Sequence, residues 1–123
     1  MQVKKWPETQ KIFLMSYSVK SIEVFERQTK RLAKKYTSLK YELQVLVQAL
    51  KEYPNQGTAI GKNCYKIRLA IKSKGKGKSS GARVITNYVV AHDAVYLLSI
   101  YDKSEKENLS DKELDELLQF IPD

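Results

Sequence analysis

The chain has very little cysteine and histidine. Cys64 is its one cysteine and His92 its one histidine among 123 residues. A single cysteine excludes a disulfide within the chain, which is typical of a reducing compartment. Metal sites draw on several such ligands, so no metal and no cofactor is expected. We expect Cys64 to be a small residue in or beside the core, and His92 to lie in a turn.

Long apolar runs are also missing. Residues 12–15 are too few for the core of a secretion signal, and no run approaches the roughly 20 residues of a membrane span. We therefore expect a cytoplasmic protein. Because 42% of the 123 residues are hydrophobic, the chain can bury the core of one domain. Trp6-Pro7 argues against a helix near the start, so we expect an N-terminal extension over residues 1–14 and a single domain over residues 15–123.

Negative charge is absent from the middle of the chain. The formal net charge is +8, and no acid occurs between Glu52 and Asp93, where eight Lys or Arg lie. A surface that serves only solubility normally mixes signs. We therefore favour an anion-binding face over lysines that merely keep a small sheet soluble. A nucleic acid or an acidic protein fits this charge. A membrane ranks last, because the densest cations do not lie on a predicted amphipathic helix.

The basic window has the period of a strand. Apolar side chains at every second position from 65 to 71 alternate with Lys66, Arg68 and Lys72. This spacing predicts a half-buried strand with one face toward a core and the other carrying a row of cations. A Lys/Gly/Ser-rich segment over residues 72–80, called here the basic loop, leads into a second strand that begins near Arg83.

Further patterns predict the rest of the fold. Strands are expected over residues 17–22, 65–72, 82–90 and 95–101. A first helix, with a narrow apolar stripe from Phe25 to Tyr36, precedes a second helix over about 39–53 for which Thr37 and Ser38 offer an N-cap. Ser110-x-x-Glu113 is a capping box that opens a last helix. This order predicts an α+β fold: a small, mainly antiparallel sheet with an N-terminal helical hairpin and a C-terminal helix.

The basic loop does not fit known nucleotide-binding loops. A P-loop needs a glycine five positions before Gly77, where this chain has Lys72, and the loop precedes a strand rather than a helix. We expect it instead to act as an electrostatic arm that grips RNA. A solvated linker without contacts stays the alternative.

Three blocks of sequence carry a resemblance to a known family. They are FERQTKRLAKKY, CYKIRLAIKSKGKGKSSGARVI and YLLSIYDKSEKENLSDKEL. With the predicted element order, they resemble the RelE/ParE toxin superfamily of bacterial type II toxin–antitoxin systems, in particular its HigB/RelE-like branch, over about residues 16–120. The resemblance implies a toxin that cuts mRNA in the ribosomal A site and is held silent by a cognate antitoxin.

The resemblance also implies site residues. Lys66 and Arg68 match the family's basic pair on its second strand, Arg83 matches its arginine on the third strand, and residues 101–103 match its functional residues at the end of the last strand. From that last segment we take Tyr101 and Lys103 as candidates. Some members continue this segment with an arginine and a tyrosine. This chain has serines at 104 and 110, so Lys103 and the loop lysines would take over those roles.

These residue types suit cleavage of RNA by its own 2′-hydroxyl. Fixed cations stabilise the negatively charged phosphorane, and Arg68 and Arg83 suit bidentate phosphate contacts. Lys66 or Lys72, each beside other cations, is the candidate general base, and the reaction needs no metal. Plain phosphate binding without chemistry fits the two arginines equally well from the residues alone. Tyr101 either stacks on a base or donates to phosphate, or simply closes the edge of the core.

The other cations of this window and of the first predicted helix are expected to bind RNA or the ribosome: Lys62, Lys74, Lys76, Lys78, Arg31, Lys34 and Lys35. The expected partners are an antitoxin with an acidic segment, the ribosome and mRNA, with no membrane. Two alternatives from other classes stay open. One is a non-enzymatic toxin of the ParE type that binds gyrase, although that branch generally lacks the basic set. The other is a simple RNA- or DNA-binding module. Cleavage of mRNA on programmed ribosomes discriminates between them.

Overall fold

The computed structural model describes residues 17–74 and 80–122. The expected extension over residues 1–14 lies outside this range. The elements are β1 (Ser18–Ser21), α2 (Glu23–Lys35), α3 (Leu39–Glu52), β2 (Thr58–Gly61), β3 (Cys64–Leu69), the 3-10 turn η1 (Lys72–Lys74), β4 (Ala82–Val89), the 3-10 turn η3 (Val90–His92), β5 (Ala94–Asp102) and α4 (Asp111–Leu118). The α+β class is confirmed.

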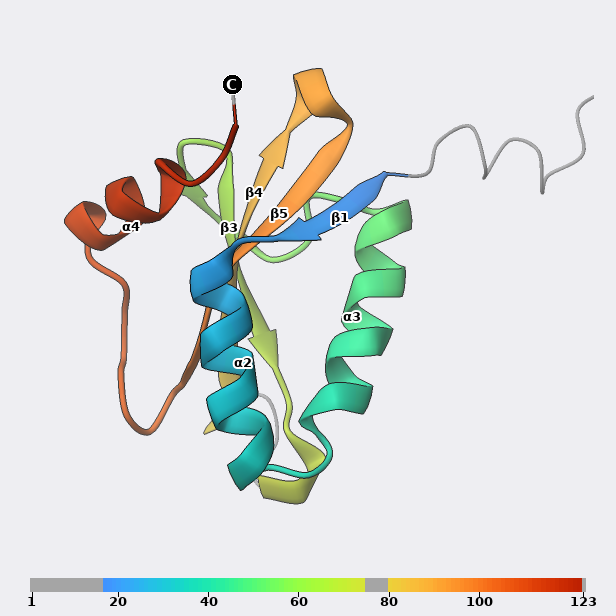
Figure 1. The fold of residues 1–123 in the computed structure, drawn as a ribbon, viewed down its shortest axis with the longest axis vertical. Helices are drawn as coiled ribbons and strands as arrows, with labels where there is room; N and C mark the ends of the chain where they lie inside the picture. Colours follow the sequence, from blue (N-terminus) through green and yellow to red (C-terminus); the bar gives the residue numbers. More distant parts are fainter. Residues whose placement is uncertain (1–16, 75–79, 123) are drawn as a thin grey trace, which may run out of the picture.

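The strands form one mixed sheet in the order β1-β5-β4-β3-β2 (Figure 1). β1 runs parallel to β5, and the pairs β5–β4, β4–β3 and β3–β2 are antiparallel. The antiparallel arrangement expected for the last three strands is confirmed. The short edge strand β2 was not predicted, because its sequence TAIG is too short to show an alternating pattern.

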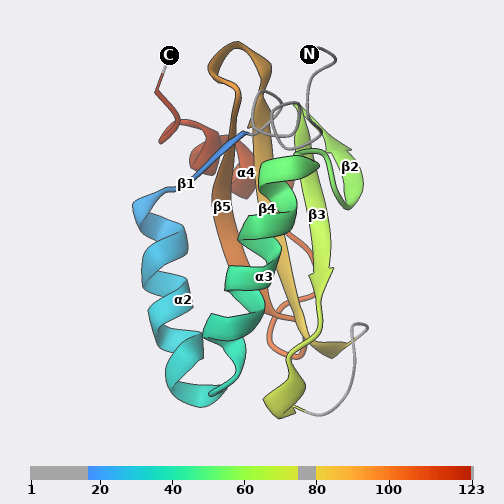
Figure 2. The same cartoon turned by 90° about the vertical axis from the view of Figure 1, so that its right-hand side faces the viewer.

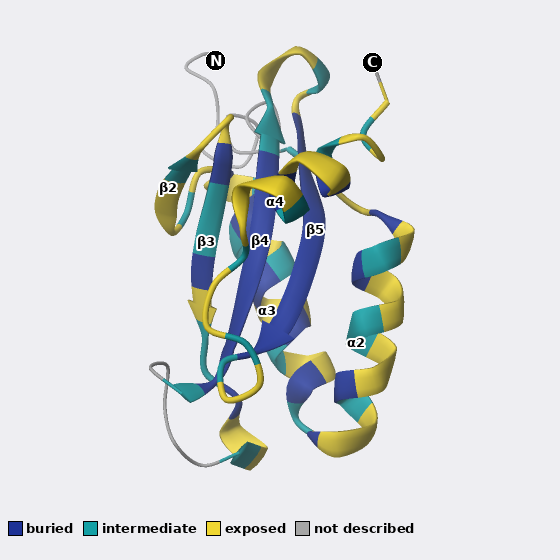
Figure 3. Cartoon of the chain, turned by 90° about the vertical axis from the view of Figure 1, so that its left-hand side faces the viewer, coloured by how far each residue is buried: buried dark blue, intermediate teal, exposed yellow. Residues whose placement is uncertain are grey.

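Helices cover both faces of the sheet. α2 and α3 form the expected antiparallel hairpin on one face, and α4 lies against the other (Figures 1 and 2). Both hairpin helices bury an apolar stripe, as their sequence period predicts: Phe25, Leu32, Leu39, Leu43, Leu46 and Leu50. β4 and β5 are buried over most of their length, because they are central strands covered on both faces (Figure 3).

The strand that carries the basic window is shorter than predicted. β3 ends at Leu69, and the next residues turn to dock on the start of α3. The Ser38 and Ser73 backbone N–H groups each donate to the other serine's Oγ, at 3.2 and 2.9 Å, and the Lys72 N–H donates to Glu42 Oε2 at 2.5 Å. Ser38 occupies the N-cap position but makes no capping bond to its own helix. Lys72 therefore lies in a turn and not on the strand.

Gly81 allows the end of β3 and the start of β4 to approach closely. A Cβ at this position would lie 2.1 Å from the Leu69 carbonyl oxygen, a distance that no side chain tolerates. Glycine at 81 therefore fixes where the basic loop rejoins the sheet, one residue before β4 begins.

Three further local predictions are confirmed, namely those for the capping box, Cys64 and His92. The Glu113 N–H donates to Ser110 Oγ at 3.1 Å and the Ser110 N–H donates to Glu113 Oε1 at 2.8 Å, which completes the capping box of α4. Cys64 is buried with 1% of its surface exposed, and His92 ends the turn η3. Within residues 17–74 and 80–122, no helix has the length and apolar character needed to cross a membrane.

Candidate functional site

Three of the candidate catalytic residues form a row across the sheet. Arg68 on β3 pairs with Arg83 on β4, and Arg83 pairs with Tyr101 on β5. Directly opposite residues of antiparallel strands point to the same face, with Cβ atoms about 4.5–5.5 Å apart. We call these residues the Arg–Arg–Tyr row. Lys66 lies two residues along β3 and therefore on the same face, opposite Ile85.

The solvent exposure of the side chains falls along the row, from β3 to the central strands β4 and β5. Arg68 is exposed, whereas Arg83 and Tyr101 have only 4% and 5% of their surface accessible. Burial of Arg83 differs from the expected row of solvent-facing cations. It follows from the place of β4 in the middle of the sheet, which only tertiary structure determines. The Arg83 Nη1 donates to the Ala82 carbonyl at 3.2 Å.

Lys66 and Tyr101 line one small concavity on the α4 face. Its volume is about 170 Å³, and Asn108 and Leu109 close it on the side of α4. The Lys66 Nζ donates to Asn108 Oδ1 at 3.1 Å. Asn108 was not among the predicted site residues, because nothing in the pattern around it indicates a contact with a residue 42 positions away. The neighbouring loop segment thus holds a candidate general base in place.

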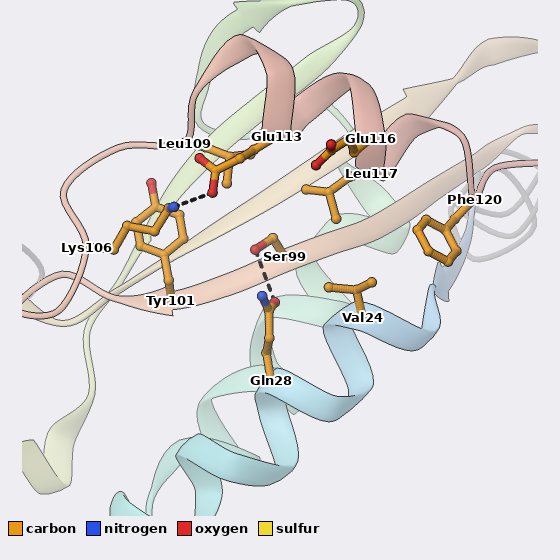
Figure 4. Close-up of a pocket in the computed structure, with 10 residues that line it drawn as sticks. All are labelled: Val24, Gln28, Ser99, Tyr101, Lys106, Leu109, Glu113, Glu116, Leu117 and Phe120. Carbon is orange, nitrogen blue, oxygen red and sulfur yellow. Dashed lines mark hydrogen bonds and ion pairs between the residues drawn. The ribbon is translucent and has the colours of Figure 1, made fainter.

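A second cavity lies on the other side of Tyr101. It measures about 300 Å³ and is enclosed by α2, β5 and α4 (Figure 4). The Lys106 Nζ donates to Glu113 Oε2 at 2.5 Å across its rim, and the Ser99 Oγ donates to Gln28 Oε1 at 3.1 Å at its floor. Lys106 together with the Ser110 N–H lowers the pKa of Glu113 to about 2. Tyr101 therefore stands in the wall between two cavities.

The Tyr101 hydroxyl has no hydrogen-bond partner within the described part of the chain, although it is buried. Burial raises the pKa of this phenol, and the nearby Glu113 charge raises it further, while Arg83 acts in the opposite direction. The hydroxyl is therefore protonated at neutral pH. A buried donor without a partner is costly, and it is available to an oxygen that enters the site.

Lys74 is not part of a solvated loop, contrary to expectation. Its Nζ donates to Asp102 Oδ1 and to the Ser80 carbonyl, each at 2.6 Å, and only 11% of the side chain is exposed. The expectation that Lys74 belongs to an unanchored arm is therefore wrong, and its contact with RNA stays a prediction. Lys76 and Lys78, the other lysines of that arm, lie outside the described residues. Lys72 is exposed.

Acids of the last third of the chain pair with most of the remaining candidate RNA-binding cations. Glu105 pairs with Arg31 at 3.4 Å and with Lys35 at 3.7 Å. Lys103 pairs with Glu107 at 3.6 Å, Lys62 pairs with Asp115, and Lys34 is exposed on α2. None of these cations belongs to the Arg–Arg–Tyr row. No group of three His, Cys, Asp or Glu side chains that could hold a metal ion occurs in the described ranges.

Comparison with known proteins identifies the family. The family described as "RelE toxin of RelE / RelB toxin-antitoxin system" matches residues 20–121. The chain belongs to the RelE toxin family. Its fold is that of a mutant Escherichia coli RelE toxin in the free state, with a TM-score of 0.59 at 18% identity, covering 87% of this chain and 99% of that one.

Two toxin–antitoxin complexes are also similar to this RelE-family toxin. The intact E. coli RelBE complex contains a chain that is 20% identical, with a TM-score of 0.46 and coverage of 71% of this chain and 96% of that one. The RelBE2 complex of Mycobacterium tuberculosis contains one that is 11% identical, with a TM-score of 0.49 and coverage of 71% and 91%.

Proposed function

We propose that this RelE-family toxin is a ribosome-dependent endoribonuclease that cuts mRNA through attack of the 2′-hydroxyl on the adjacent phosphate. The observation that carries the proposal is the Arg–Arg–Tyr row with Lys66 beside it on the same face. Two guanidinium groups and a phenol in line provide donors for several oxygens of one phosphate. Such a preorganised array stabilises charge that develops on a phosphorane, which is usually the largest contribution to catalysis.

The chemistry assigns one role to each side chain. The 2′-oxygen loses its proton to the Lys66 amine and forms a bond to phosphorus, while the bond from phosphorus to the 5′-oxygen breaks. The leaving 5′-oxygen takes a proton from the Tyr101 hydroxyl. Proton transfer through water from the Lys66 ammonium to the Tyr101 oxygen then returns both side chains to their starting states. Arg68 and Arg83 neutralise the phosphorane oxygens. The products are a 2′,3′-cyclic phosphate and a free 5′-hydroxyl.

The ribosome has a definite part in this proposal. Arg83 and Tyr101, the two buried members of the row, leave only part of the site open to a free RNA strand. In-line attack requires one particular backbone geometry, and a message held on the ribosome supplies such a geometry at low entropic cost. The exposed cations Lys34 and Lys72 would contact ribosomal RNA. The translating ribosome would place the action of the toxin in the cytoplasm.

The proposed partner in the resting state is an antitoxin with an acidic segment. Membership of the RelE toxin family makes this chain one half of a toxin–antitoxin pair. Covering cations without pairing them costs free energy, so the antitoxin should place carboxylates near Arg68 and the other exposed cations.

The test of this function is expression of the chain in cells followed by primer extension on a translated message. We expect growth arrest and new 5′ ends within codons that ribosomes occupy. The same message with its start codon removed is the matched control and should stay intact. Growth arrest with intact mRNA and poisoned gyrase would support a ParE-type toxin instead. Binding of RNA with neither arrest nor cleavage would leave a simple RNA-binding module.

A further inference from the structure

Asp102 is a fully buried carboxylate at the end of β5, with 0% of its surface exposed. One oxygen accepts from the Tyr36 hydroxyl at 2.6 Å. The other accepts from the Lys74 Nζ at 2.6 Å, from the Ser104 N–H at 2.9 Å and from the Ser104 hydroxyl at 2.7 Å. We call Asp102 with these three partners the Asp102 hub. The Lys35 Nζ lies 4.0 Å from the same carboxylate.

The hub ties together three segments that are distant in sequence. Tyr36 ends α2, Lys74 ends the turn η1 at the start of the basic loop, and Ser104 begins the segment after β5. The Lys74 ammonium also holds the Ser80 carbonyl. A single ammonium therefore fixes both described ends of the basic loop against Asp102.

The carboxylate of the hub is ionised across the physiological range. Burial alone would raise the pKa of Asp102, but the hydrogen bonds from Lys74, Tyr36 and Ser104 outweigh burial and hold it below its usual range. Buried ion pairs often add little net stability compared with apolar side chains of similar volume. Such a pair instead fixes the relative positions of the segments that it joins. Here these are the cation-bearing end of α2, the turn η1 and the segment after β5.

Each segment that the hub joins carries cations predicted from the sequence as catalytic or RNA-binding candidates. Lys35 precedes Tyr36, Lys72 belongs to the same turn as Lys74, and Lys103 precedes Ser104. The hub also adjoins the candidate catalytic residues, because Asp102 follows Tyr101 and pairs with Ala82, the residue before Arg83. One carboxylate thus anchors segments that carry candidate cations, at the ends of the strands that carry Arg83 and Tyr101.

We propose that Asp102 is a positioning residue that holds the end of α2, the turn η1 and the segment after β5 in one arrangement that binds RNA phosphates. The proposal rests on the proposed function, because it concerns the RNA of that same site. Asp102 touches no RNA itself. Its effect passes through Lys74, Tyr36 and Ser104.

Simple electrostatics makes the opposite prediction, which gives a sharp test. A carboxylate near an RNA-binding edge repels phosphates, so neutralising it should strengthen binding as the net charge rises from +8 to +9. If Asp102 positions the cationic segments, Asp102→Asn should instead weaken binding, because these segments lose their common anchor. Misplacing groups by about 1 Å can cost up to about 100-fold in activity. We expect a loss of at least about tenfold in RNA affinity.

The experiment measures binding of a short single-stranded RNA to the full chain by fluorescence anisotropy at several salt concentrations, beside kcat and KM for cleavage on programmed ribosomes. The variants are Asp102→Asn, Lys74→Gln and the double variant, which restores the net charge of the wild type. We expect all three to bind RNA at least about tenfold more weakly and to raise KM more than they lower kcat. Equal or tighter binding by Asp102→Asn or by the double variant would overturn the proposal.

Two further variants and a control complete the test. Asp93→Asn is the matched control, because it removes one carboxylate from an exposed left-handed turn that asparagine tolerates. It should bind RNA as well as the wild type or slightly better, and weakening like that of Asp102→Asn would overturn the proposal, because the loss would then not depend on the contacts of Asp102. If Asp102→Asn does not fold, Tyr36→Phe and Ser104→Ala test the proposal instead. Each of them removes a hydroxyl donor to Asp102 without changing the net charge. Wild-type affinity in both would contradict the proposal.

The failure of the proposed function is separable from the failure of the hub. If the wild type binds RNA but does not cleave it, the proposed ribonuclease activity is wrong. The RNA affinities of the variants still test the role of Asp102 in that case. A wild type that does neither overturns both.

Discussion

Arg68 and Arg83 face each other directly across β3 and β4, so two like charges share one pair position of the ladder. Like charges at such positions destabilise a sheet. A bound phosphate would convert this repulsion into attraction, because both guanidinium groups would then pair with it. This juxtaposition supports the proposal that the row binds a phosphate.

The first prediction concerns these two arginines. Arg83→Ala should lower the rate of mRNA cleavage by about 10²–10³-fold, as loss of one donor to a developing oxyanion does elsewhere. Arg68→Gln should also lower cleavage but should raise the free energy of unfolding by about 0.2–1 kcal/mol, because it removes the repulsion. Urea unfolding and single-turnover cleavage measure the two effects. Lys112→Ala, on the exposed side of α4, is the control and should change neither. Full activity in folded Arg83→Ala would remove the row from the mechanism.

The second prediction concerns the unpartnered hydroxyl of Tyr101. Tyr101→Phe removes a buried donor that has no partner within the described residues. The variant should be as stable as the wild type or up to about 1 kcal/mol more stable. Cleavage should nevertheless fall at least about tenfold, because the hydroxyl is the proposed donor to the leaving oxygen. Tyr41→Phe is the control, since Tyr41 is 69% exposed on α3. Unchanged cleavage would reduce Tyr101 to an aromatic that closes the edge of the core.

The third prediction is a loss of stability in acid. The pKa of Glu113 falls from an ordinary 4.5 to about 2 in the folded protein. A lowered folded-state pKa stabilises the fold above the unfolded value, and this contribution is lost as the pH falls from about 4.5 to about 2. Asp102, whose pKa is also lowered, adds a loss that continues at still lower pH. Glu113→Gln should flatten the fall of the urea midpoint between about pH 4.5 and 2, whereas Glu116→Gln on the same helix should not.

The fourth prediction separates the lysines of the basic loop. Replacing Lys76 and Lys78 together by Ser should reduce the salt slope of ribosome binding by close to one for each phosphate that these lysines neutralise, with unchanged thermal stability. Lys74→Ser should behave differently, because it leaves the Asp102 carboxylate buried without its ammonium. Breaking a buried pair in this way costs about 3–5 kcal/mol. Equal melting temperatures for the two variants would show that Lys74 belongs to the solvated arm after all.

Local patterns in the sequence were enough to predict most of the helices and strands. The capping box Ser110–Glu113, the leucine repeat of α3 and the alternation through Lys66 and Arg68 each involve residues within a few positions of one another. Their structure follows from backbone geometry that neighbouring residues share, so the pattern alone predicts it. The short strand β2 had no such pattern, and it forms because β3 offers it a partner.

The sequence indicated the members of the candidate row but not their environment, and two further catalytic candidates, Lys72 and Lys103, lie outside the row. Residue type and spacing, with the family resemblance, indicated Lys66, Arg68, Arg83 and Tyr101. The register of three strands then decided that Arg68, Arg83 and Tyr101 form one row. The central position of β4 decided that Arg83 is buried. Register and strand order depend on pairings across the whole sheet, and a run of letters does not encode them locally.

Composition and short-range periodicity can be read directly from the order of residues. They were enough to indicate a basic α+β domain with a cationic strand. Only the tertiary structure decided that Lys74 serves Asp102 rather than solvent, and that Asn108 holds Lys66. These contacts join residues 28 and 42 positions apart. The sequence shows that lysines are present but not which anion each one contacts. The fold determines which carboxylate lies within reach of each ammonium group.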